Sequence, residues 1–244
     1  MYPRSVYTDD QAAALYNVLN PWGASDAYYL ALAMAAPSVL DVGCGTGTML
    51  HRAREAGHTG RLAGVDPDQA MLAIARQRDD VEWVTCTAAE MAWDAEFDLA
   101  VMMSHAFQNF ITNDDLRASL AAIHRSLAGG GRFVFETRNP AMREWEEWHP
   151  GNPMDVVDPA GRALRISYEV LSVVGDVVTL TETTSDPDGP VLRVDEGKLR
   201  FLDEETLVRK LEAAGFVIEA IHGGWAGEAF GPTSAEIVVT ARKA

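Results

Sequence analysis

A glycine-rich turn between a short apolar run and a helical segment constrains the fold more than any other stretch of this chain. The apolar residues are Val39, Leu40 and Val42, glycines follow at positions 43, 45 and 47, and the helical segment begins at Thr48. Glycine lets the backbone approach a bound molecule closely because no Cβ intervenes. The first turn of a helix also presents free N–H groups at that point. The stretch therefore predicts a strand, a ligand-binding turn and a helix.

The spacing of the glycines separates three kinds of nucleotide site. A P-loop needs a lysine after its last glycine, and none follows Gly47. The dinucleotide fingerprint spaces its glycines as G-x-G-x-x-G, whereas this turn has G-x-G-x-G. An acid, Asp41, stands two residues before the first glycine. A carboxylate there would repel a pyrophosphate but suits a ligand that carries a cationic amine and a sulfonium.

Residues 41–47, with the sequence Asp-Val-Gly-Cys-Gly-Thr-Gly, closely resemble the first motif of the class I S-adenosylmethionine (SAM)-dependent methyltransferases of the small-molecule type. The resemblance implies that SAM is the cofactor and that it contacts Asp41, Gly43, Cys44, Gly45 and Gly47. It also implies an α/β fold: a Rossmann-like, seven-stranded, mostly parallel sheet with helices on both faces and an antiparallel last strand. The motif by itself says nothing about the methyl acceptor.

A second acid ends the next predicted strand, residues 61–66. Asp66 follows Gly47 by 19 residues, close to the ~20 residues at which an acid reaches ribose hydroxyls in α/β nucleotide sites. A carboxylate accepts hydrogen bonds from both hydroxyls of the ribose. Asp66 and Pro67 resemble the second family signature, which implies that they hold the ribose, and Asp68 is expected to cap the following helix.

The third predicted strand, residues 81–86, departs from the family pattern. Family members usually have an Asp after this strand that binds the adenine amine, followed by a small residue beside the ring. Here those positions are Thr87 and Ala88. A threonine hydroxyl can accept the same hydrogen bond without the charge, and Glu90 is an alternative acceptor. Thr87 and Ala88 are therefore predicted to contact the adenine.

A fourth buried strand, residues 97–103, leads into Ser104 and His105. This resembles the fourth family motif, which lies at the carboxyl edge of the sheet, where open α/β sheets bind ligands. Ser104 is accordingly expected at the cofactor. Histidine changes charge near neutral pH more readily than other side chains, so His105 is the candidate general base. The alternative for His105 is a packing or hydrogen-bonding role.

The strands and helices alternate as far as a fifth strand, residues 132–137, which predicts parallel pairing with right-handed crossovers. Glycines at 129–131 are expected to end the helix that precedes this strand. A last helix, capped by Asp203, and two further strands complete the sheet, and the resemblance places the last strand antiparallel between the fifth and the sixth.

Two segments stand outside this alternation within a single methyltransferase domain over residues 1–244. Residues 1–36 read as an aromatic, helical lid, and the resemblance favours Tyr16 as a catalytic residue near the sulfonium; the alternative is packing on the sheet edge. Residues 141–202 read as an inserted antiparallel meander, including a two-residue hairpin at Gly175. The insertion resembles the substrate cap of small-molecule methyltransferases, and a sheet extension or a dimer surface is the alternative.

The charge of the chain restricts its partners. The net charge is −16 and the pI about 4.7, so phosphate backbones and anionic membranes would be repelled. Two cysteines are too few for a disulfide framework or a zinc site. No paired acids of the kind that bind Mg²⁺ in catechol-type methyltransferases stand out, and no metal is predicted. We expect a cytoplasmic protein, compatible with a homodimer, whose partner is a small-molecule acceptor and neither nucleic acid nor membrane.

These features predict a SAM-dependent methyltransferase that transfers a methyl group to N or O of a small molecule by in-line displacement. Two alternatives remain. A SAM-binding protein without transferase activity would carry the same motifs. An NAD-binding oxidoreductase is disfavoured by the spacing of the glycines and by Asp41.

Overall fold

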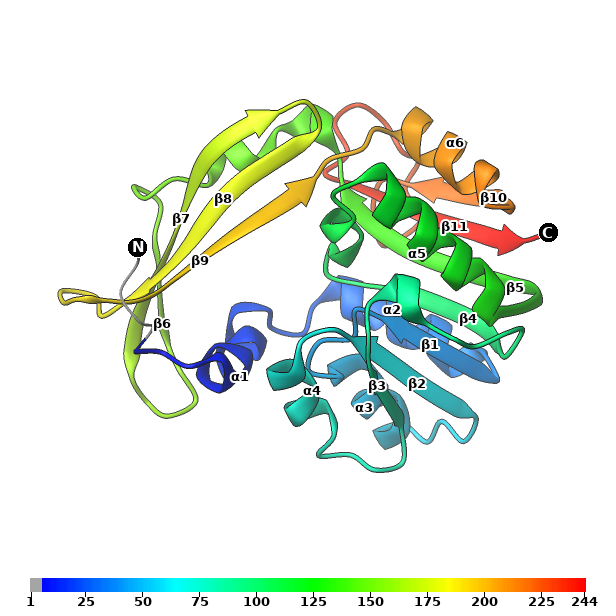
Figure 1. Cartoon of the computed structure of the whole chain (residues 1–244), viewed down its shortest axis with the longest axis horizontal. Helices are drawn as coiled ribbons and strands as arrows, with labels where there is room; N and C mark the ends of the chain where they lie inside the picture. Colours follow the sequence, from blue (N-terminus) through cyan, green and yellow to red (C-terminus); the bar gives the residue numbers. More distant parts are fainter. Residues whose placement is uncertain (1–5) are drawn as a thin grey trace. The chain divides into compact units, whose positions relative to one another are not determined.

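The computed structural model describes residues 6–244 and divides the chain into two compact units (Figure 1). The core unit comprises Trp22–Met142 and Leu202–Ala244, and the insert unit comprises Met1–Pro21 and Arg143–Phe201. Residues 1–5 of the predicted lid segment lie outside the described residues.

The core unit is built on a seven-stranded sheet with the strand order β10-β11-β5-β4-β1-β2-β3. β11 pairs antiparallel with both of its neighbours, β5 and β10, and the other pairings are parallel. This arrangement confirms the predicted fold class, including the position of the last strand. The strands are β1 (Ser38–Val42), β2 (Arg61–Asp66), β3 (Glu82–Thr85), β4 (Phe97–Met102), β5 (Leu127–Arg138), β10 (Phe216–His222) and β11 (Glu236–Lys243).

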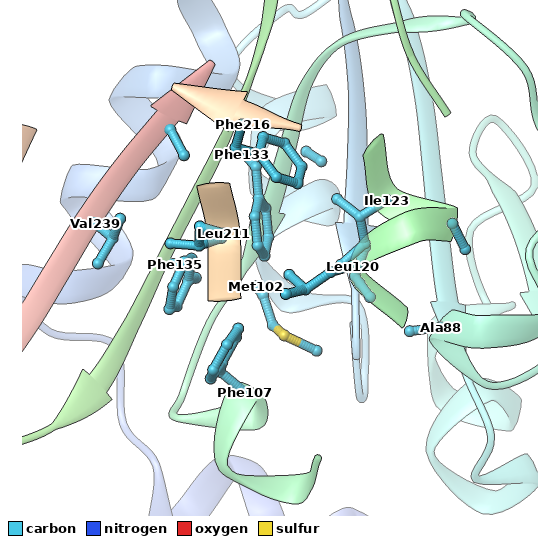
Figure 2. Packing of buried hydrophobic residues seen from close by; sticks show 14 of the residues in the cluster. Ala88, Met102, Phe107, Leu120, Ile123, Phe133, Phe135, Leu211, Phe216 and Val239 are labelled. Atoms are coloured by element: carbon cyan, nitrogen blue, oxygen red, sulfur yellow. The ribbon is translucent and has the colours of Figure 1, made fainter. Parts of the chain in front are cut away.

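Helices cover both faces of this sheet because side chains alternate between the faces along each strand. Phe133 and Phe135 of β5 point to one face and pack with residues of α5 (Asn113–Ser126) and α6 (Glu204–Ala213). Figure 2 shows these rings beside Leu120, Ile123 and Leu211. Val134 points to the opposite face, where α2 (Ala24–Ala35) and α3 (Thr48–Glu55) pack. A shorter helix, α4 (Gln69–Ala75), connects β2 to β3.

The ends of several helices follow the local sequence signals. Asp68 caps α4 by accepting from the backbone N–H groups of Ala70 and Met71, and Asp203 caps α6. Gly57 follows α3 with φ of +90°, a conformation that glycine adopts without strain. The prediction for residues 129–131 is wrong. α5 ends at Ser126 and β5 begins at Leu127, so the three glycines lie inside the strand.

The insert unit combines α1 (Asp9–Leu19) with a four-stranded antiparallel sheet of order β6-β7-β8-β9. A buried cluster joins the helix to the sheet through Leu15, Leu164, Ile166 and Leu192. In the hairpin predicted at Gly175, Val174 pairs with Val177 and Gly175 has φ of +61°. The strands are β6 (Met154–Val157), β7 (Ala163–Val174), β8 (Val177–Ser185) and β9 (Val191–Arg200).

The segment predicted as one helical lid is divided between the two units. α1 groups with the insert unit, whereas α2 packs on the core sheet through Tyr29 and Ala33. Across residues 6–244, no helix is long and apolar enough to cross a membrane.

Candidate functional site

The glycine turn between β1 and α3 is packed on one side and open on the other. All three glycines have positive φ, +76° at Gly43, +53° at Gly45 and +75° at Gly47. A Cβ on Gly47 would come within 2.5 Å of the indole of Trp83, whereas a Cβ on Gly45 would meet nothing within 4 Å. Gly47 is therefore required by the packing of the protein itself, and Gly45 leaves space for a ligand.

Asp66, at the end of β2, ties this turn to the neighbouring strand. One carboxylate oxygen accepts from the backbone N–H of Gly45 at 2.8 Å, and the other accepts from that of Asp68 at 2.8 Å. Burial raises the pKa of Asp66, and these two hydrogen bonds oppose the rise. Each oxygen retains lone pairs for further donors, so the geometry is compatible with the predicted ribose contact. Pro67, beside it, is exposed.

Asp41 is buried beneath the turn, with 3% of its surface exposed. Its Oδ1 atom has no hydrogen-bond partner among the described residues. Burial raises its pKa to about 8, and the neighbouring carboxylates Asp66 and Glu136 add to the rise. Buried polar atoms are normally hydrogen-bonded, and an unmatched acid is costly unless a cation or donor neutralises it. Asp41 therefore fits a cationic ligand such as SAM at this turn.

Thr87 and Glu90 form one capping arrangement after β3. Both the backbone N–H and the hydroxyl of Thr87 donate to a carboxylate oxygen of Glu90, at 2.9 and 2.7 Å. The hydroxyl proton is thus committed, while the hydroxyl oxygen can still accept from an amine. Ala88 follows and is buried. The predicted adenine contacts at Thr87 and Ala88 stay predictions.

Ser104 and His105 form a loop after β4 in which both residues have positive φ, +53° and +58°. The backbone N–H of His105 donates to Glu136 at 3.0 Å. Its imidazole Nε2 lies 2.9 and 3.0 Å from the two carboxylate oxygens of Glu236. The loop therefore brings His105 between two carboxylates at the carboxyl edge of the parallel strands.

Three residues of this site were missed from the sequence: Tyr29, Glu136 and Glu236. The buried hydroxyl of Tyr29 on α2 donates to Glu136. A signal did exist for Glu136, because it lies near the end of the fifth parallel strand, as Asp66 does for the second. Glu236 begins an antiparallel strand, so it starts at the edge where the parallel strands end.

The site is predominantly acidic. Burial raises the pKa of Glu136, an effect that His105 and the Tyr29 hydroxyl oppose. Burial, and then Glu136, raise the pKa of Tyr29 well above its ordinary value, so the hydroxyl keeps its proton. Burial also raises the pKa of the Cys44 thiol in the turn. Within the described chain, no group of three or more His, Cys, Asp or Glu residues is placed to hold a metal ion.

Tyr16, the other predicted catalytic residue, lies on α1 in the insert unit and is half-buried. It belongs to a different unit from the glycine turn, Asp66 and His105, so its role near the sulfonium stays a prediction. The remaining predicted residues, from Asp41 to Ser104, all lie in the core unit.

Comparisons with known proteins relate this chain to methyltransferases. Residues 39–131 match a family model described as a methyltransferase domain. The cypemycin N-terminal methyltransferase of a Streptomyces species is 29% identical over 83% of this chain and 81% of its own length. A Streptomyces venezuelae dTDP-3-amino-3,4,6-trideoxy-alpha-D-glucopyranose N,N-dimethyltransferase is 29% identical over 79% of this chain and 80% of its own.

A crystal structure of a SAM-dependent methyltransferase from Clostridium acetobutylicum has a TM-score of 0.76 at 16% identity. The structural alignment covers 96% of this chain and 98% of that protein. The fold, the glycine turn with its buried acid, and the methyltransferase domain matched over residues 39–131 together support a class I SAM-dependent methyltransferase.

Proposed function

We propose that this protein transfers the methyl group of SAM to an amine nitrogen of a small molecule. The observation that carries the SAM part is the buried carboxyl of Asp41, whose Oδ1 atom has no hydrogen-bond partner among the described residues, next to a glycine turn that is open at Gly45. SAM supplies an electrophilic methyl group on a sulfonium, which leaves as a neutral thioether. The chain's own task is positioning, which can supply about 7–11 kcal/mol of the barrier in such displacements.

The core unit offers a partner for each part of the cofactor. Asp66 would accept from the ribose hydroxyls, and the Thr87 hydroxyl, with Ala88 beside it, would receive the adenine amine. Gly43, Gly45 and Gly47 would admit the cofactor to the backbone of the turn, and the carboxylate of Asp41 would balance its cationic part. Ser104 would line the same edge of the sheet.

Two relatives support an amine as the acceptor. The relatives aligned over about 80% of this chain are named as an N-terminal methyltransferase and an N,N-dimethyltransferase. Four carboxylates at the site also favour a cationic partner over an anionic one: Asp41, Asp66, Glu136 and Glu236. The net charge of −16 opposes nucleic acid as an acceptor.

His105 is our candidate for the general base. An amine that arrives as an ammonium ion must lose a proton before its lone pair can attack, and a positioned base typically adds about 10²–10⁴-fold. His105 follows β4, beside β1, where the strand order of the sheet reverses. Ligands of open α/β sheets bind at this position.

The test measures methyl transfer to matched acceptors. The purified protein is incubated with SAM and either a short peptide with a free α-amine or the same peptide with that amine acetylated. An amino-sugar nucleotide and its hydroxyl counterpart form a second pair. We expect the mass of a methyl substituent to appear on an amine member only. SAM binding without product on any acceptor would favour a binding protein, and methylation of the hydroxyl members would overturn the amine assignment.

A further inference from the structure

The loop that carries His105 is held in a strained conformation. Ser104 and His105 are consecutive non-glycine residues with positive φ, a backbone region that costs conformational energy for residues with a Cβ. Such strain persists only where surrounding contacts impose it, and it is concentrated at functional sites. The contacts that impose it here are therefore informative about His105.

One carboxylate fixes the backbone of this loop. Glu136 is 1% exposed, accepts from the His105 N–H at 3.0 Å, and accepts from the Tyr29 hydroxyl through its other oxygen. Tyr29 belongs to α2 and is itself fully buried where that helix packs on the sheet. The direction in which the His105 side chain leaves the loop is thus set from within the core of the sheet.

A second carboxylate fixes the imidazole. Both oxygens of Glu236 lie within 3.0 Å of Nε2. An ionised carboxylate accepts hydrogen bonds but has no hydrogen to donate. Nε2 must therefore carry the hydrogen, which leaves the lone pair of a neutral imidazole on Nδ1. No residue of the described chain hydrogen-bonds Nδ1. His105 and Glu236 are each about one-fifth exposed, so water screens their interaction only in part.

We propose that Glu236 is a positioning residue that holds His105 as the Nε2–H tautomer and so makes Nδ1 the atom that accepts the proton of the acceptor. The proposal rests on the proposed role of His105 as the base. The acceptor ammonium gives its proton to Nδ1 and keeps the electron pair of the N–H bond. The resulting imidazolium lies beside the Glu236 carboxylate and later releases the proton to water.

The first test reads the tautomer directly and needs no acceptor. Protein labelled with ¹⁵N-histidine is studied by long-range ¹H–¹⁵N NMR at a pH where the histidines are neutral, and the His105→Asn variant identifies the His105 signals. We expect wild-type His105 to show a protonated Nε2 and an unprotonated Nδ1. In Glu236→Gln, the amide offers both a donor and an acceptor at nearly unchanged volume, so we expect a mixture of tautomers. Glu236→Ala should give a mixture as well.

The control variant is Glu219→Gln. Glu219 lies on β10 of the same sheet and pairs with arginines, not with a histidine, so the wild-type tautomer should persist. An Nδ1–H tautomer in the wild type would overturn the proposal. So would a tautomer unchanged in both Glu236 variants while their melting temperatures show that they are folded. If Glu236→Ala fails to fold, Glu236→Gln decides.

The second test separates this proposal from the proposed function. With an amine probe that the wild type methylates, Glu236→Gln should lower kcat at least tenfold while the dissociation constant for SAM changes less than twofold. An unchanged kcat would count against the positioning role. If the wild type methylates no amine, the proposed function fails, and the tautomer measurement still decides whether Glu236 fixes His105.

Discussion

At the scale of single residues, Asp41 is an acid whose pKa is raised to about 8. Burial is the main cause, and the carboxylates of Asp66 and Glu136 add to it. Below that pH the carboxyl is protonated in the free protein, and a cationic ligand favours its ionised form, so binding must release a proton. We therefore expect the affinity for SAM to rise up to tenfold per pH unit from about pH 6 to about pH 8 and then to level off. Calorimetry in buffers of different ionisation enthalpy counts the proton. Asp41→Asn should abolish the release, and an equal release in that variant would refute the assignment.

The same pKa makes a prediction for the free protein. The folded-state pKa of Asp41, about 8, lies above its ordinary value of 3.8, so the fold binds the proton more tightly than the unfolded chain does. The contribution of Asp41 to stability is then greatest at low pH and falls between about pH 4 and pH 8, by up to about 1.4 kcal/mol per unit. Urea unfolding of wild type and Asp41→Asn should show the largest difference near pH 8, with the variant more stable. A constant difference across this range would contradict the shift.

Asp66 carries a prediction about affinity. It accepts from two backbone N–H groups and is proposed to accept from the ribose, and hydrogen bonds to a charged group contribute about 1.5–3 kcal/mol each. Asp66→Ala should therefore weaken SAM binding by about 10–100-fold, measured by calorimetry. Asp80→Ala is a matched control, because Asp80 lies outside the site and pairs with arginines on the surface. Equal affinity of Asp66→Ala and the wild type would refute the pocket.

At the scale of elements, substitutions at two glycines of the turn are expected to differ: one mainly lowers the stability of the fold and the other mainly lowers the affinity for SAM. Gly45→Ala and Gly47→Ala both place a side chain at positive φ, which costs about 1–2 kcal/mol. Only at Gly47 does the new Cβ also meet the indole of Trp83, and overpacking adds about 1–3 kcal/mol. Denaturation should show the larger loss of stability for Gly47→Ala. Gly45→Ala should stay folded and lose SAM affinity because its Cβ occupies the open side. Full SAM affinity in Gly45→Ala would show that the ligand lies elsewhere.

Elements whose ends depend on nearby residues could be predicted from the sequence, whereas elements that depend on pairing with distant strands could not. Asp68 and Asp203 act within one helical turn, so the sequence located the starts of those two helices. Glycines 129–131 carried a local signal for a helix stop, but Leu127 pairs with Phe97 of β4, so β5 begins before the glycines, and its continuous pairing with β4 and β11 starts at Arg132. Tertiary pairing there outweighs local preference. Within the meander predicted over residues 141–202, the individual strands depend on such pairing too, as the four residues of β6 do on β7.

At the scale of the whole molecule, the sequence indicated the residues of the proposed cofactor site more fully than the surroundings of the proposed base. Asp41, Gly45 and Asp66 are close in sequence and share one βαβ unit, which a motif can describe. The contacts of His105 join β4 to Glu136 and to Glu236, which is 131 residues away. Only the position of β11 between β5 and β10 brings Glu236 to this edge. A single sequence contains no spacing rule for such a contact.

The whole molecule also responds to ligand through mass action. A ligand that binds only the folded protein stabilises it by about 2.7 kcal/mol at one hundred times its dissociation constant. For a chain of this length that corresponds to a rise in melting temperature of about 5–10 °C. We expect this rise with the demethylated product S-adenosylhomocysteine and none with NADH, because the turn lacks the dinucleotide spacing and is preceded by an acid, Asp41, that disfavours a pyrophosphate. Asp66→Ala should lose most of the rise and Asp80→Ala should keep it. A larger rise with NADH than with S-adenosylhomocysteine would contradict the proposed SAM site, because the pyrophosphate of NADH would then bind close to the acid Asp41.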